Sequence, residues 1–207
     1  LLSKTLREAN LLHELSSLLG IEDSNNKFEV TKLFLKMKTS IEKQNDKNIN
    51  RIVADVYADY GTDDNIDFMV NYLNNAKGFS GFTAMGNTTK YLKRCKPETV
   101  DKALPAYENI ARNGSAWYIK LNATNQLTTI ANENDKKINE LRKDIDQAQK
   151  DGKSSAELMQ DQNMVKTLTE QKERILKTTD DIKNSETDER LKKIYAGKGS
   201  VEFGDGE

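Results

Sequence analysis

The chain has one histidine, His13, and one cysteine, Cys95, and these two residues are the natural starting points for catalysis or metal binding. An imidazole that works as a general base or a metal ligand needs partners that the sequence around His13 does not supply. The charges of Lys93, Arg94 and Lys96 would lower the pKa of the Cys95 thiol, but no histidine is near it in sequence to act as a base. We therefore expect no catalytic site at either residue.

The acidic pairs Asp63–Asp64 and Asp180–Asp181 are the remaining residues that suggest chemistry. Adjacent residues diverge on a helix, so neither pair brings two carboxylates together, and helix capping or solvation explains them better. The sequence contains no zinc-protease, nucleophile-elbow or calcium-loop motif. These observations predict a protein that is not an enzyme, with no catalytic residues, no cofactor and no metal.

Composition points to a helical bundle with a thin core. Of the 207 residues, 36% are hydrophobic and 31% are charged, and there are only two prolines. The 32 basic residues nearly balance the 33 acidic ones, which gives no net field to attract nucleic acid. No run of about 18 apolar residues is present, so we expect no stable membrane span.

The elements that organise the chain are two long helices between Ser115 and Ile182. Apolar residues alternate at steps of four and three in the first arm, and a less regular stripe follows in the second. The stripe residues are Leu127, Ala131, Asn134, Ile138, Leu141, Ile145 and Ala148, then Leu158, Val165, Leu168, Ile175 and Ile182. Gly152 and the capping-box sequence Ser154–Glu157 separate the arms. This pattern predicts a long antiparallel hairpin.

Two side chains of this hairpin are predicted to fix its packing. Asn134 lies in the apolar seam, where an amide lowers stability but can set the register if a partner satisfies it. Trp117 opens the first arm and is expected to lock the smaller helical region onto the long helices.

We expect four parts in all: N-terminal helices at 1–77 that pack on the bundle, a glycine/aromatic loop with a small helical appendage at 78–114, the hairpin at 115–182, and a short helix with a flexible tail at 183–207. The fold class is all-α, an elongated three-helix-type bundle in which the N-terminal helices cover the hairpin. Within it, Gly61 ends one helix and Thr62-Asp63-Asp64 begins the next.

The segment from Gly78 to Asn87 has three glycines, two phenylalanines and no charge. We interpret it as a loop, which either tucks its rings against the bundle or contacts another protein. On the second interpretation, the partner-contact residues are Phe79, Phe82, Met85, Asn87 and Tyr91.

The order of features from Met69 to Thr179 resembles the minor pilins of bacterial type IV secretion systems, the TraC-like pilus-tip family. Met85-Gly86-Asn87 and Tyr91-Leu92 stand where that family has a glycine segment and a Tyr-Leu turn. Residues 145–150 and 156–160 resemble its helical hairpin.

This resemblance implies a non-enzymatic structural and adhesion protein of a secretion or conjugation pilus. It would be exported to the periplasm, the cell surface or the medium, and its partners would be the major pilin and other secretion-system proteins. A secreted α-helical toxin or effector that acts on host cells, and an intracellular coiled-coil scaffold, are the alternatives.

Overall fold

The computed structural model describes residues 47–78 and 80–198, and this part of the chain is built from helices without strands. Residues 1–46, which hold part of the predicted N-terminal helices, Phe79 and the tail from residue 199 lie outside the described residues. The described elements are α3 (Lys47–Tyr60), the short 3₁₀ helix η1 (Asp63–Asn65), α4 (Ile66–Asn75), α5 (Ser80–Leu92), α6 (Pro97–Asn113), α7 (Trp117–Lys150), α8 (Ser155–Ser185) and α9 (Glu189–Tyr195). The all-α prediction is confirmed.

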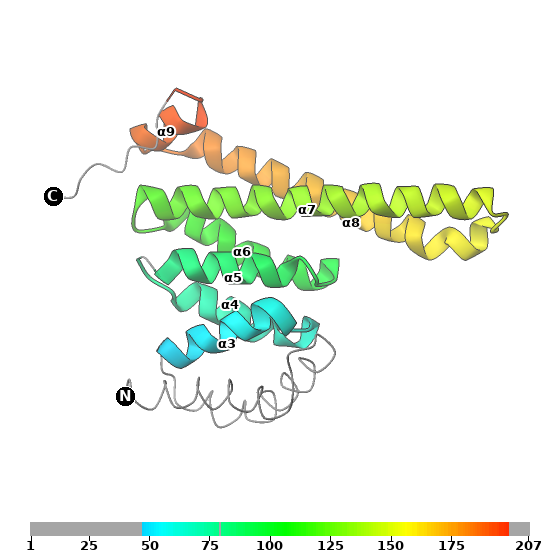
Figure 1. Ribbon diagram of the computed structural model, residues 1–207. Coiled ribbons are helices and arrows are strands. Elements are labelled where there is room, and N and C mark those ends of the chain that lie inside the picture. The colour runs from blue at the N-terminus through cyan, green and yellow to red at the C-terminus, as the bar shows by residue number, and fades with distance from the viewer. Residues whose placement is uncertain (1–46, 79, 199–207) are drawn as a thin grey trace.

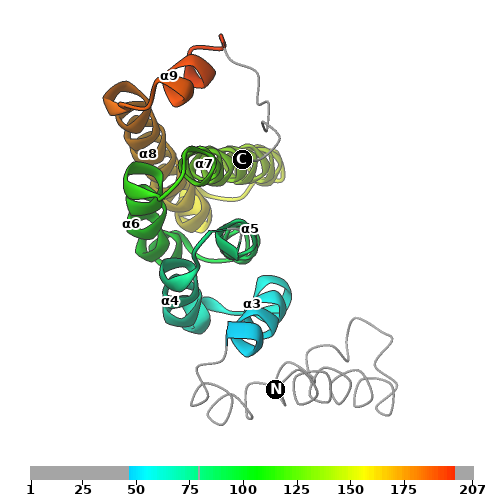
Figure 2. The same cartoon turned by 90° about the vertical axis from the view of Figure 1, so that its left-hand side faces the viewer.

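The helices form two layers. Viewed along the long helices, α3, α5 and α7 lie in one layer and α4, α6 and α8 in the other (Figure 2). Each helix contacts the next helix of its own layer, as α3 does α5 and α5 does α7, and neighbours in the chain pack across the layers. The predicted hairpin is α7 and α8, which run antiparallel and extend well past the other described helices (Figure 1).

Turn chemistry sets several of the helix ends. The N–H of Gly61 donates to the carbonyl of Tyr57 at 2.9 Å, and a Cβ at position 61 would lie only 2.7 Å from that oxygen. Thr62 then stands at the N-cap of the next element, and its N–H donates to the side chain of Asn65, to Oδ1 at 2.9 Å. Both boundaries are as the sequence predicts.

The hairpin turn also follows its sequence signals. Gly152 has φ of +83°, a backbone conformation that glycine adopts without steric cost. Ser154 and Glu157 form the expected capping box, in which the Ser154 N–H donates to Glu157 Oε2 at 2.7 Å. These bonds lower the pKa of the Glu157 carboxyl.

The predicted glycine/aromatic loop is wrong, because α5 occupies Ser80–Leu92. Among the described glycines only Gly78, Gly152 and Gly197 have positive φ, so Gly81 and Gly86 do not break the helix. Helix α5 lies between α3 and α7, where it buries Ala84 and Met85 completely. Tertiary burial thus outweighs the low helix propensity of glycine.

The helices that cover the hairpin are α5 and α6, whereas α3 and α4 pack on α5 and α6. This corrects the expectation that the N-terminal helices cover the hairpin, as far as residues 47–77 are concerned. The third helix of the three-helix arrangement is α6, which contacts both α7 and α8. Its inner face buries Val100, Ala103, Tyr107 and Ala111.

Candidate functional site

A buried polar junction joins α6, α7 and α8. The amide nitrogen of Asn134 donates to Gln171 Oε1 at 2.9 Å, and Gln171 Nε2 donates to the Pro97 carbonyl at 2.7 Å and to Asp101 Oδ1 at 2.8 Å. Asn134 is 3% exposed and Gln171 is fully buried. The buried amide of Asn134 therefore has the hydrogen-bond partner that its predicted role in setting the register requires.

Gln171 is a residue that the apolar pattern alone does not reveal. Asn134 lies 18 residues before Gly152 and Gln171 lies 19 residues after it, so the two are at the same level of the hairpin. Counting outward from the turn would have found this pair. Lys172, the next residue in α8, pairs with Asp135 across the edge of α7 and α8, and the contact lowers the pKa of Asp135.

Charged side chains close the outer side of the junction. Arg174 Nη2 lies 3.0 Å from both carboxylate oxygens of Asp101, the same group that accepts from Gln171. Beside this ion pair a groove of about 440 Å³ runs between α6 and α8. Leu127 and Ile175 lie at its buried side, and its rim carries charges of both signs, including Lys177 and Asp181. Such a rim favours no single class of charged ligand.

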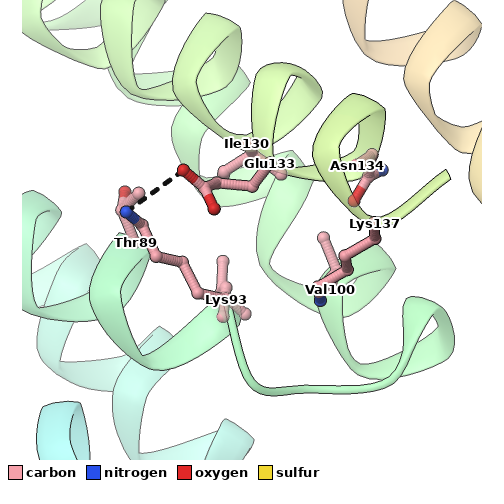
Figure 3. Close-up of a pocket in the computed structure, with 8 residues that line it drawn as sticks. Thr89, Lys93, Val100, Ile130, Glu133, Asn134 and Lys137 are labelled. Carbon is pink, nitrogen blue, oxygen red and sulfur yellow. Dashed lines mark ion pairs between the residues drawn. The ribbon is translucent and has the colours of Figure 1, made fainter. Parts of the chain in front are cut away.

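A small cavity of about 10 Å³ lies on the other side of the junction, where α5, α6 and α7 meet (Figure 3). Its volume is roughly that of one water-sized probe. Lys93 Nζ lies 3.3 Å from Glu133 Oε1 across its mouth, and the ion pairs with Lys136 and Lys93 lower the pKa of Glu133. Burial lowers the pKa of Lys137, which lies beside Asn134 in the same wall. The cavity lies between three helices and is too small to hold a substrate.

The structure corrects the expected environment of Cys95. Its side chain is 6% exposed and Sγ donates to the Tyr91 carbonyl at 3.4 Å. Burial raises the pKa of this thiol, because desolvation outweighs the nearby cations. Among residues 47–78 and 80–198 no group of three or more His, Cys, Asp or Glu side chains is arranged to hold a metal ion.

The predicted partner-contact residues do not form an exposed loop. Met85 and Tyr91 are fully buried, and the Tyr91 hydroxyl donates to the Thr62 carbonyl at 2.6 Å. Asn87 Nδ2 donates to Asp55 Oδ1 at 2.6 Å, which ties α5 to α3. Since Met85 and Tyr91 lie in the core, they are not available to a partner, and Phe79 lies outside the described residues.

Aromatic contacts join the start of α7 to its neighbours. Phe82 of α5 stacks on Tyr118 with ring centroids 5.9 Å apart. Trp117 packs edge-on against Tyr118 at 5.8 Å, and the guanidinium of Arg190 in α9 lies 4.9 Å from the Trp117 ring centroid. Trp117 thus has a role in packing, and one of its contacts fixes α9 to the hairpin.

The hairpin beyond α6 has a different surface, and we call residues 138–150 and 155–168 the overhang. Its two helices bury a single seam against each other, formed by Ile138, Ile145, Leu158 and Leu168. Leu141, Met164 and Val165 are half-buried there, and Met159 is 59% exposed. None of the other described helices covers this region (Figure 1). The overhang therefore presents apolar side chains that the rest of the described chain does not use.

Searches against models of known protein families, curated proteins and solved structures find no match to this chain. Within residues 47–78 and 80–198, every helix is too short or too polar to cross a membrane.

Proposed function

We propose that this protein is a non-enzymatic structural and adhesion component of a bacterial type IV secretion or conjugation pilus, exported to the periplasm or cell surface. The overhang is the part that docks on other proteins of the assembly. The resemblance of residues 69–179 to minor pilins supports the class of protein. The protruding hairpin, which no other described helix covers and which leaves Leu141, Met164 and Met159 partly or largely exposed, is the observation that carries the docking role.

The overhang is only two helices thick, so no third described helix covers its apolar side chains. Near α6 the hairpin residues Leu127 and Ile175 are each 1% exposed, because a third helix covers them. One heptad or more toward the tip, Leu141 and Met164 remain half-buried. Apolar surface of this kind at the end of a protruding arm favours association with another protein.

A shortened hairpin tests the proposal without changing the rest of the protein. Deletion of residues 141–147 and 158–164 removes one heptad from each arm, which keeps the facing positions in register and leaves the turn and the Ser154–Glu157 capping box in place. The matched control is Leu176→Ala, which alters an exposed leucine of α8 outside the overhang.

The measurement is the amount of each variant in sheared pili from the strain that encodes the protein. We expect the unaltered protein and the Leu176→Ala control to be exported and to copurify with the major pilin. The shortened variant should be folded by circular dichroism and exported, yet lost from the pilus fraction. Retention of the unaltered protein in the cytosol would contradict the proposal, and equal recovery of the shortened variant would contradict the docking role of the overhang.

A further inference from the structure

The described helices repeat one pattern, in which a helix of one layer is followed by a helix of the other. The pairs are α3 with α4, α5 with α6, and α7 with α8, and each pair packs on the next (Figure 2). Short links, residues 76–79 and 114–116, join one pair to the next. In such an array each pair buries its apolar faces against its neighbours, so the outer face of an end pair has to be polar or covered.

Helix α3 carries an apolar face on the outer side of the array, where no described helix lies beyond α3 and α4 (Figure 2). Val56 and Tyr60 are one turn apart on this helix, and isoleucine precedes Val56 by four and by seven residues in the sequence. Ala54 and Tyr57 of the same helix are fully buried in the core. Two apolar faces on one helix are typical of a helix that is covered on both sides.

Helix α4 continues this apolar face with two aromatic rings. Phe68 stacks on Tyr72 with ring centroids 6.4 Å apart, and it meets the Tyr57 ring edge-on at 5.3 Å. Phe68 and Tyr72 are only half-buried, although Met69 beside them is fully buried. We call the apolar surface at this end of the array the end face, and its residues are Val56, Tyr60, Phe68 and Tyr72.

The segment before α3 has the length and the connection to cover the end face. Residues 1–46 lie outside the described part of the chain, and their sequence predicts one helix at 1–19, a break at Gly20 and a second helix at 27–44. The link from Gln44 to Lys47, where α3 begins, spans at most about 11 Å. Since packed helix axes are roughly 8 to 10 Å apart, the second predicted helix has to lie beside α3.

Apolar spacing and charge both suit this position. Both predicted helices repeat apolar residues at steps of three and four, namely Leu2, Leu6, Ala9 and Leu12 in the first and Val30, Phe34, Met37 and Ile41 in the second. Residues 27–44 contain five lysines and two glutamates, whereas residues 47–77 contain five aspartates and three basic side chains. A positively charged helix is therefore attracted to the α3–α4 pair.

We propose that residues 1–44 form a fourth helix pair, which stacks on the end face and completes the array at that end. The first helix of this pair extends the layer of α3, α5 and α7, and the second extends the layer of α4, α6 and α8. The inference goes beyond the proposed function, because the contact forms within one chain whether or not the protein enters a pilus. It also gives the N-terminal helices a position other than the hairpin.

Hydrogen–deuterium exchange of the purified full chain, followed by mass spectrometry of its peptides, tests the proposal. We expect the amides of residues 6–19 and 31–44 to exchange at least about tenfold more slowly than those of an unstructured peptide. Val56→Arg places a charge in the end face and should remove most of this protection, while α7 and α8 keep theirs. Leu141→Arg, at a half-buried position of the overhang, is the matched control and should leave residues 1–46 protected.

A second variant examines the contact from the other side, in case Val56→Arg unfolds α3. Ile41→Arg leaves every described residue unchanged and should speed exchange both in residues 1–46 and in α4, because the end face loses its cover. Thr39→Arg, on the lysine-rich side of the same predicted helix, should leave both unchanged.

Exchange in residues 1–46 as fast as in an unstructured peptide would overturn the inference. Protection that is lost in Leu141→Arg but kept in Val56→Arg would also overturn it, because the N-terminal segment would then lie on the hairpin. Protection that neither Val56→Arg nor Ile41→Arg reduces would show that the end face is not the surface that residues 1–46 contact.

Discussion

The buried junction of Asn134 and Gln171 allows a quantitative prediction of coupling. In the Asn134→Leu variant, Gln171 Oε1 loses its donor in a dry environment, which costs about 2 kcal/mol. In Gln171→Leu, the Asn134 amide loses its partner and Asp101 loses one donor but keeps Arg174, which costs about 2 to 3 kcal/mol. The double leucine variant should cost only about 1 to 2 kcal/mol, because apolar replacement of the Asn134–Gln171 pair is nearly neutral, and only the Pro97 carbonyl and Asp101 still lose the Gln171 donor.

The double-mutant cycle therefore predicts a coupling energy of about 3 kcal/mol between the two residues. Urea unfolding followed by far-ultraviolet circular dichroism gives the four free energies of unfolding. Asn132→Leu and Gln162→Leu are matched controls, since both side chains are exposed on the same two helices, and their cycle should show no coupling. Effects of the junction variants that simply add, within about 0.5 kcal/mol, would refute the assignment of the junction as one unit.

The same variants test whether the junction sets the register. Spin labels at Gln149 and Ala156, exposed residues on either side of the turn, report the alignment of the two arms. We expect one narrow distance distribution in the unaltered protein and a broader one in the double leucine variant, because two leucines pack in several alignments whereas the amide pair bonds in one. An unchanged distribution would mean that the turn alone fixes the register.

Two further predictions concern local stability. Gly86→Ala should raise the free energy of unfolding by about 0.5 to 1 kcal/mol, since position 86 is an exposed helical site where an added Cβ meets nothing within 4 Å. Gly61→Ala should lower the free energy of unfolding, because its Cβ would lie 2.7 Å from the Tyr57 carbonyl oxygen. Thermal unfolding compares the two variants, and a destabilised Gly86→Ala protein would contradict the open surroundings of position 86 in α5. Burial would raise the pKa of Glu186, but the N–H groups of Asp188 and Thr187 and the Lys120 ammonium together hold this pKa below its ordinary value. The stability that the Glu186 carboxylate contributes is therefore present above the ordinary carboxyl pKa and is lost as the pH falls through the lowered pKa of the folded protein. Glu186→Gln should therefore reduce the loss of stability in acid, with Trp117 fluorescence reporting the release of α9, and an unchanged acid profile would show that other carboxyls dominate.

Much of the helical framework is readable from local sequence. Gly61, Thr62 and the Ser154–Glu157 box mark helix ends through bonds within a few residues, which need no tertiary contact to form. The spacing of apolar residues on either side of Gly152 predicts the hairpin for the same reason, because a stripe on each arm and a short break between them leave few other arrangements.

The segment from Gly78 to Asn87 shows where local reasoning fails. Its glycines and aromatic residues have weak helix propensity, yet α5 forms because α3 and α7 bury Met85 and Tyr91 from opposite sides. In the sequence alone, apolar residues that form the core look the same as apolar residues that contact a partner. Only the position of α5 between two other helices distinguishes these alternatives.

By itself, then, the sequence determined that the protein is helical, where its long arms begin and end, and that an amide lies in their seam. The tertiary structure decided that Gln171 satisfies that amide, that α5 and α6 rather than α3 and α4 cover the base of the hairpin, and that Leu141 and Met164 lack such cover. The physical reason is range: capping and helical periodicity act over a few residues, whereas the burial of a side chain depends on helices that are distant in sequence and meet only in the folded chain.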